Sequence, residues 1–310
     1  MEYPRPKIPF YKVRTFGEKL NISFEFLRET WKPLLKMSFY LILPLCLIQA
    51  FAMEAYIRMA FAISGNPDHM TTGLVSFLGN YGLLMLCFLV GSCVLSALVY
   101  SLMQTYERRE RRLLDITLAD VKALFMKNVG KMFKVTLFII GVVLLLFVII
   151  ALLAWVSLWT LVVTIPVLLI GLILVAIPLA LFTPLYLFED MPFAVALNKA
   201  LRYGFSAWGE MFLVVLVFGM LGGIISGVTT MPWYVVTVIG QVFAQVEPDS
   251  GINSALWYRV ATYLLGIIQS YGTYISSIIS SVGIAFQYFH LRETKEGVSV
   301  KADIANFDRL

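Results

Sequence analysis

The stretch FEDMPFAVALNKALRYGFSAWGEMFLVVLVFGML, residues 188–221, joins a short amphipathic segment to a long apolar run. Pro192 follows two acidic residues, and Lys199 and Arg202 then lie about one helical turn apart. The pair Trp-Gly at Trp208 interrupts the pattern before the apolar run begins. This order predicts a helix that rests on a membrane surface, turns, and continues into a helix that crosses the membrane.

The composition of the whole chain agrees with a location in a bilayer. Hydrophobic residues make up 60% and charged residues 14% of the 310 residues, and the mean hydropathy is +0.84. Soluble domains are about half apolar and a quarter charged. The apolar runs lack the alternation of barrel strands, and a lipid-exposed backbone must satisfy its own hydrogen bonds, so helices are expected. We therefore predict an all-α, polytopic membrane protein.

Apolar runs predict six transmembrane helices in three hairpins, each preceded by a cytoplasmic amphipathic surface helix. The expected spans are 34–51, 74–102, two helices within 135–188 that turn near 157–160, 210–230 and 254–288. Residues 1–33 form a cytoplasmic N-terminal segment with the first surface helix, 34–290 the six-helix domain, and 291–310 a cytoplasmic tail. Pro166, Pro178 and Pro184 are expected to kink the fourth span, and Pro232 to end the fifth.

The three surface helices are expected to end in similar breaks. The tripeptides are WKP at 31–33, VGK at 129–131 and WGE at 208–210. We interpret them as a threefold internal repeat of a surface helix followed by a two-span hairpin. The alternative is that any six-span protein with surface helices would show the same pattern.

Basic residues predict the topology. Segments 1–36, 104–134, 189–209 and 289–310 hold eight, eight, two and four of the 24 Lys and Arg residues. The remaining two, Arg58 and Arg259, fall at the opposite face. The bias towards positive cytoplasmic loops therefore places both termini in the cytoplasm.

Enzymatic chemistry is not expected. No predicted span has an ionisable residue at its centre, and the chain has neither a metalloprotease motif nor a serine-hydrolase motif. His69 and His290 are expected on opposite faces of the membrane. The three cysteines lie in apolar runs and are interpreted as packing residues, so neither a cofactor nor a metal is predicted.

Polar residues are concentrated in the sixth predicted span. Such a stripe either lines a cavity for a polar or amphiphilic ligand or provides hydrogen bonds between helices. The candidate cavity residues are Gln269, Ser270, Thr273, Tyr274, Ser276, Ser277, Ser280 and Ser281.

Two further sets are singled out by charge and by size. A cytoplasmic basic collar could contact anionic lipid headgroups or simply enforce topology. Its members are Arg108, Arg109, Arg111, Arg112, Lys122, Lys127 and Lys131. Gly219, Gly223 and Gly227 recur every four residues and predict a seam where another helix packs closely.

The segment YLFEDMPFAVALNKALRYGFSAWGEMFLVVLV resembles the membrane domain attached to some bacterial glycerophosphodiester phosphodiesterases, and related six-helix bacterial membrane proteins. The matching positions are Glu189, Ala196, Leu197, Lys199, Ala200 and Leu201, together with the later segment YFHLRETKEG. The carboxylates and histidines of the phosphodiesterase catalytic domain are not found in this sequence, so the resemblance concerns only the membrane portion. Glu189 and Asp190 are interpreted as hinge and cap residues.

These observations favour a non-enzymatic integral membrane protein that acts as a membrane scaffold or handles lipid-like, amphiphilic molecules. The alternative is a small-solute transporter or channel with a polar pathway along the sixth helix. Membrane lipids are the expected partners, with another membrane protein left open as a further partner, and no nucleic acid is expected.

Overall fold

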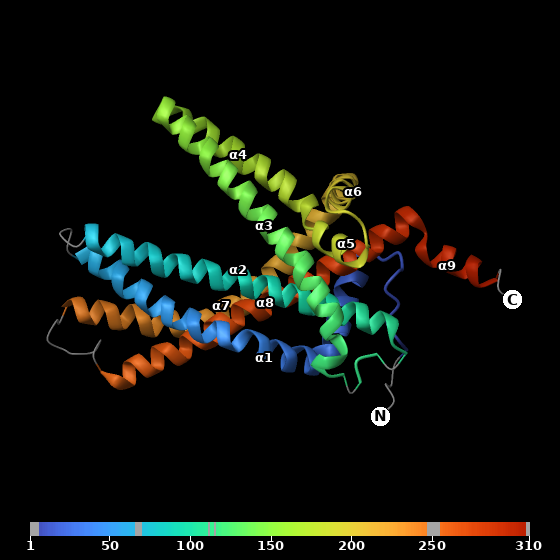
Figure 1. Cartoon of the computed structure of the whole chain (residues 1–310), viewed down its shortest axis with the longest axis horizontal. Coiled ribbons are helices and arrows are strands. Elements are labelled where there is room, and N and C mark those ends of the chain that lie inside the picture. The colour runs from blue at the N-terminus through green and yellow to red at the C-terminus, as the bar shows by residue number, and fades with distance from the viewer. Residues whose placement is uncertain (1–5, 66–69, 111, 115, 247–254, 308–310) are drawn as a thin grey trace. The chain divides into compact units, whose positions relative to one another are not determined.

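The computed structural model describes residues 6–65, 70–110, 112–114, 116–246 and 255–307. It is all-helical, at 90% helix, with no strand in these described ranges. The helices, labelled in Figure 1, are α1 (Phe16–Gly65), α2 (Met70–Arg108), α3 (Leu118–Val156), α4 (Leu158–Leu179), α5 (Phe182–Phe188), α6 (Phe193–Ser206), α7 (Trp208–Val246), α8 (Leu256–Glu296) and α9 (Val298–Phe307). The predicted all-α class is therefore confirmed.

Five helices in the described ranges are long and apolar enough to cross a membrane. The candidate spans are Phe16–Ile57, Val75–Arg108, Leu118–Trp155, Val162–Phe188 and Trp208–Ala244. No residue in the most apolar part of the α3 span is buried against protein, as expected for a helix that faces lipid. The predicted sixth span lies in α8, which has 41 residues but is not among these five because its Ser, Thr, Tyr and Gln residues lower its hydropathy.

Two of the three predicted surface helices are not separate helices. The 50-residue α1 runs through Trp31 and Pro33 without a break, and α3 runs through Gly130. The third break is real, because α6 ends at Ser206 and α7 begins at Trp208. The helix–break–helix unit therefore occurs only at the third position of the predicted repeat.

Proline also ends fewer helices than predicted. Pro232 lies inside α7, which continues to Val246. In lipid, ending a helix exposes backbone groups that have no water to bond, so the chain keeps the helix and tolerates one missing N–H. In the fourth span the prolines do divide the chain, because α4 and α5 are separate helices with Pro184 in the second of them. The predicted turn at Ser157 is confirmed.

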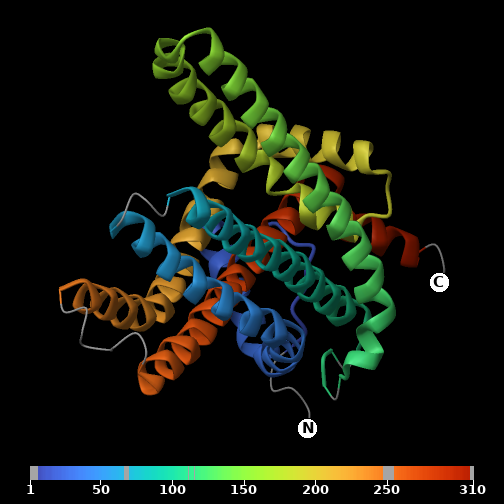
Figure 2. The ribbon, with the colours of Figure 1, turned by 60° about the vertical axis from the view of Figure 1, so that its left-hand side comes forward.

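The chain forms two compact units. The first unit comprises the described residues up to Leu34, Ser96–Gly219, and the chain from Ser280 onwards. The second unit comprises the described parts of Leu35–Leu95 and Met220–Ile279. In the first unit, α3 and α4 lie side by side as a hairpin, as the views in Figures 1 and 2 both show.

The core of the first unit is aromatic and includes the segment that precedes α1. Phe10 is buried, and its ring centroid lies 4.7 Å from that of Phe289 and 5.6 Å from that of Tyr106. The backbone N–H of Ile8 donates a hydrogen bond to the Tyr106 hydroxyl at 3.2 Å. This packing fixes the N-terminal segment against α2 and the C-terminal end of α8.

The core of the second unit is organised around Tyr274. Its hydroxyl lies 2.9 Å from the backbone oxygen of Cys87 and 3.0 Å from Oε1 of Gln49. The ring occupies the space beside Gly91, where any Cβ would overlap it. Glycine at this position therefore allows α2 and α8 to approach closely.

Candidate functional site

A buried carboxylate lies between α5 and α6. Glu189 ends α5 and is only 8% exposed. Its Oε2 lies 2.6 Å from Nζ of Lys199, and its Oε1 accepts a hydrogen bond from the Tyr288 hydroxyl at 3.0 Å. Nε of Arg292 lies 3.5 Å from the same Oε1. Glu189 is thus a charged link between α6 and α8 as well as the predicted helix-end residue.

A second carboxylate completes the cluster. Glu296 lies 2.6 Å from Lys199, 3.1 Å from Arg292 and accepts a hydrogen bond from the Tyr203 hydroxyl at 2.8 Å. Burial alone would raise the pKa of Glu296, but the hydrogen bonds from Lys199, Tyr203 and Arg292 outweigh it and lower the pKa to about 2. Burial likewise tends to lower the pKa of Lys199, and its bonds to the two glutamates raise it overall. Both partners are therefore charged at neutral pH.

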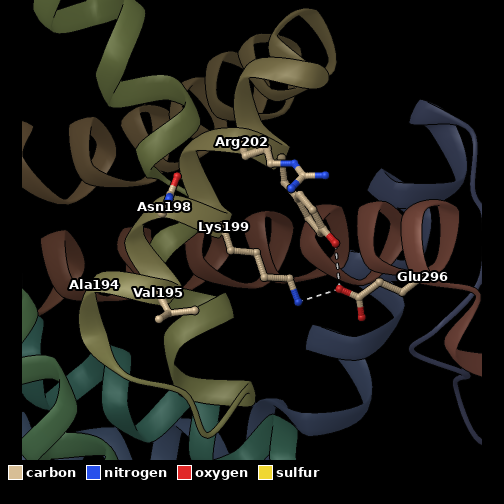
Figure 3. A pocket seen from close by; sticks show the side chains of 7 residues that line it. Ala194, Val195, Asn198, Lys199, Arg202 and Glu296 are labelled. Carbon is tan, nitrogen blue, oxygen red and sulfur yellow. Dashed lines mark hydrogen bonds and ion pairs between the residues drawn. The ribbon is translucent and has the colours of Figure 1, made fainter.

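An open hollow of about 640 Å³ lies against this cluster. Figure 3 shows Lys199 reaching towards Glu296, with Arg202 outside that pair. The lining residues are Ala194, Val195, Asn198, Lys199, Arg202, Tyr203 and Glu296. All but the last belong to α6. They line one hollow because positions four residues apart on a helix share a face.

A separate polar cluster joins α1, α7 and α8 in the first unit. Nζ of Lys19 lies 2.9 Å from Glu210 and 2.7 Å from Oε1 of Gln287. His290 accepts a hydrogen bond at Nδ1 from the backbone N–H of Arg14 at 3.0 Å, and its Nε2 lies 3.3 Å from Glu210. Burial lowers the pKa of His290, and the Lys19 charge lowers it further. The imidazole is consequently neutral at pH 7.

A second hollow lies in the second unit. This Tyr271 groove, as we name it, has a volume of about 410 Å³ and is lined by Leu35, Lys36, Phe39, Tyr40, Tyr271 and Ile275. Tyr271 is held in place by its hydroxyl, which lies 3.0 Å from Oγ of Ser38, and by an edge-on ring contact with Phe39 at 5.9 Å. Lys36 is exposed and supplies the only charge among the lining residues.

The polar stripe of α8 forms hydrogen bonds with protein groups. Ser276 donates to the Thr273 carbonyl and Ser277 to the Tyr274 carbonyl, each at 2.7 Å. Ser270 donates to Oε1 of Gln269 at 3.3 Å, and Thr273 donates to the Gln269 carbonyl at 3.0 Å. In the first unit, Ser280 donates to the Phe218 carbonyl at 3.3 Å, and the Ser281 carbonyl accepts from Tyr100 at 3.4 Å. The four bonds in the second unit are local to α8, whereas Ser280 and Ser281 bond to residues of α7 and α2.

The basic collar divides into paired and exposed members. Arg112 is buried and lies 2.6 Å from Glu29, whereas Arg109 lies 3.4 Å from Asp120. Lys127 and Lys131 lie 2.9 Å and 3.0 Å from Asp190, and their hydrogen bonds lower the pKa of that carboxyl to about 2. Arg108 and Lys122 are exposed, and Arg111 lies outside the described residues. Headgroup contact stays a prediction, with these two exposed cations as its clearest candidates.

The three glycines of α7, predicted as a packing seam, do not contact another helix within the described residues. Within the described residues, no atom of another element lies within 4 Å of a Cβ built at Gly219, Gly223 or Gly227. The neighbouring Met220 and Ile224 are about 60% exposed, so this face of α7 points outward. Periodicity identifies a glycine face, but which direction that face points depends on the packing of the other helices.

Sequence reasoning missed the Tyr271 groove and most of the cluster around Glu189. The i,i+4 spacing of Arg292 and Glu296 was a usable signal, since such pairs share a helix face. In the described ranges, no three His, Cys, Asp or Glu side chains are grouped as a metal site would require.

Comparisons with protein-family models, curated proteins and solved structures found no match to this chain.

Proposed function

We propose that the chain is an integral membrane protein that holds lipid-like amphiphiles, with the Tyr271 groove, hereafter the lipid groove, as one binding site. The observation that carries the proposal is the composition of the groove. A single lysine, Lys36, lies beside aromatic and aliphatic side chains on helices α1 and α8. A cation for a headgroup next to an apolar surface for a chain is what an anionic phospholipid requires.

The proposal includes the expected topology. Six spans in three hairpins, with α8 as the sixth span and both termini in the cytoplasm of a bacterial inner membrane, agree with the distribution of basic residues. Lys36 then lies near the cytoplasmic boundary of α1, where a lysine can extend its ammonium group to the headgroup level. The resemblance to the membrane domain of glycerophosphodiester phosphodiesterases supports a role beside lipids, without catalysis by this chain.

Hydrogen bonding along α8 supports this proposal over a small-solute pathway. The hydroxyls of Thr273, Ser276, Ser277 and Ser280 all donate to backbone carbonyls. A hydroxyl whose hydrogen is already donated to a backbone carbonyl presents no free donor to a passing solute. We therefore propose that the amphiphile binds at the surface of the helices and not along a central channel.

The test is lipid retention measured by native mass spectrometry. The purified chain is reconstituted with equal amounts of phosphatidylglycerol and phosphatidylcholine, and the lipids that remain bound are counted. We expect a preference for phosphatidylglycerol that Lys36→Gln reduces several-fold. Lys32→Gln, which removes an exposed lysine of α1 outside the groove, is the matched control. Equal retention of the two lipids by the wild type, or equal losses in the two variants, would overturn the proposal.

A further inference from the structure

The hollow on α6 has a charge pattern that differs from that of the lipid groove. Beneath it, the cations Lys199 and Arg292 face the carboxylates Glu189 and Glu296. Four charges of alternating sign at separations between 2.6 and 3.5 Å neutralise one another. Because each carboxylate has cationic partners, neither presents a free negative charge to a molecule that enters the hollow.

Arg202 is the cation left over. It is exposed at the hollow, and it has neither a hydrogen bond nor an ion pair in the part of the chain that the structure describes. The net charge of the walls and of the cluster beneath them is therefore that of one guanidinium. Figure 3 shows Arg202 separate from the dashed bonds that link Lys199 to Glu296.

Asn198 lies one helical turn before Arg202 and lines the same hollow. Its side chain is exposed, and its amide can donate two hydrogen bonds. The Tyr203 hydroxyl already donates to Glu296, so it contributes shape more than hydrogen bonds. Ala194 and Val195 add a small apolar wall on the same helix.

We propose that this hollow binds a phosphate group. The planar guanidinium of Arg202 donates two parallel hydrogen bonds to phosphate oxygens, and Asn198 donates a third. Lys199 is held at the base of the hollow by its bonds to Glu189 and Glu296, so Arg202 supplies the uncompensated charge. The hollow, of about 640 Å³, has room for the molecule that carries the phosphate as well as for the phosphate itself.

Phosphate chemistry could come from a soluble phosphate monoester or from a lipid headgroup, and one experiment distinguishes these sources. Glycerol 3-phosphate is titrated into the purified full chain in a neutral detergent and followed by calorimetry. In parallel, the chain is reconstituted in nanodiscs of phosphatidylcholine with or without phosphatidic acid, and bound lipid is counted. Wild type, Arg202→Gln, Arg202→Lys and Arg28→Gln are compared.

We expect Arg202→Gln to weaken phosphate binding about tenfold or more, since charge-assisted bidentate bonds are the strong ones. Arg202→Lys keeps the positive charge but loses the two parallel hydrogen bonds of the guanidinium. Its affinity for phosphate is expected to lie between those of the wild type and Arg202→Gln. Arg28→Gln removes an exposed arginine of α1 outside the hollow and should match the wild type. Glycerol 3-phosphate binding that Arg202→Gln weakens identifies a soluble ligand. A loss of bound phosphatidic acid in Arg202→Gln, without glycerol 3-phosphate binding to the wild type, identifies a headgroup.

The proposal is overturned if neither probe binds the wild type, or if Arg202→Gln and Arg28→Gln behave alike. Arg202 is exposed, so its substitution should leave the melting temperature unchanged, and an equal melting temperature confirms that the variant is folded. Lys36→Gln in the lipid groove should leave the response to glycerol 3-phosphate intact. The two sites therefore succeed or fail separately.

Discussion

Nζ of Lys199 lies 2.6 Å from Oε2 of Glu189, and this carboxylate is 8% exposed where α5 meets α6. The pair joins two residues that are ten positions apart, across the only loop in the stretch from 182 to 206. Arg292 and Tyr288 approach Glu189 from α8. Glu189 thus links three segments of the first unit through one side chain.

Removing the charge of Glu189 should destabilise the protein. Glu189→Gln leaves Lys199 and Arg292 with Glu296 as their remaining carboxylate, and breaking a buried ion pair from one side costs about 3 kcal/mol. The neighbouring Asp190→Asn is the control, because Asp190 is 72% exposed and exposed pairs contribute little. Thermal unfolding in detergent measures both. Equal melting temperatures for the two variants would contradict a linking role for Glu189.

His290 should make stability depend on pH below neutrality. Burial, and then the charge of Lys19, lower its pKa from 6.5, so the folded chain resists protonation. As the pH falls below 6.5, His290 of the unfolded chain binds a proton that the folded chain does not. The free energy of unfolding therefore decreases between pH 6.5 and the lower pKa of His290 in the folded chain. The contribution is therefore complete above pH 6.5.

Melting temperatures between pH 7.5 and 5.5 test this dependence. His290→Gln can still accept from the Arg14 N–H and donate to Glu210, but it does not titrate, so we expect a flatter profile. Asp190 and Glu296 do not interfere, because the pKa of each is held at about 2. Parallel profiles for wild type and variant would assign the pH dependence to other groups.

The sequence predicted the helical class and the turn at Ser157, because apolar length and composition are properties of the chain itself. It misplaced helix ends at Pro33 and Pro232, because a helix in lipid keeps its remaining backbone hydrogen bonds even where proline removes one N–H. It identified Glu189 as a helix-end residue but did not predict its ion pairs with Lys199 and Arg292. Those contacts depend on how α6 lies against α8, which periodicity alone does not determine.

Gly204 should be required for the docking of α6 on α4. A Cβ at Gly204 would lie 2.5 Å from the backbone Cα of Pro178, and a backbone cannot move aside as a flexible side chain can. Gly204→Ala should therefore separate the two helices and lower the melting temperature. Gly209→Ala, which meets no described atom within 4 Å, is the matched control and should have no such effect. A cysteine pair placed across α4 and α6 should crosslink in the control and less well in Gly204→Ala.

Thr237 offers a case where removing a polar atom should stabilise the protein. Its Oγ1 is buried and has no hydrogen-bond partner in the part of the chain that the structure describes. It borders a cavity of about 10 Å³, and Thr262, on the same cavity, donates its hydroxyl to the Tyr258 carbonyl at 2.9 Å. An unpaired buried hydroxyl costs about 1–3 kcal/mol, so Thr237→Val, which keeps the shape, should raise the free energy of unfolding by about 1 kcal/mol.

Thr262→Val is the matched control, because it removes a hydroxyl that is already bonded. It should be neutral or destabilising. We therefore expect Thr237→Val to be the most stable protein, followed by the wild type, with Thr262→Val no more stable than the wild type. Thermal unfolding of the three proteins in the same detergent gives this order directly. A loss of stability in Thr237→Val would instead show that the Thr237 hydroxyl bonds a water molecule in the cavity, which is large enough for one.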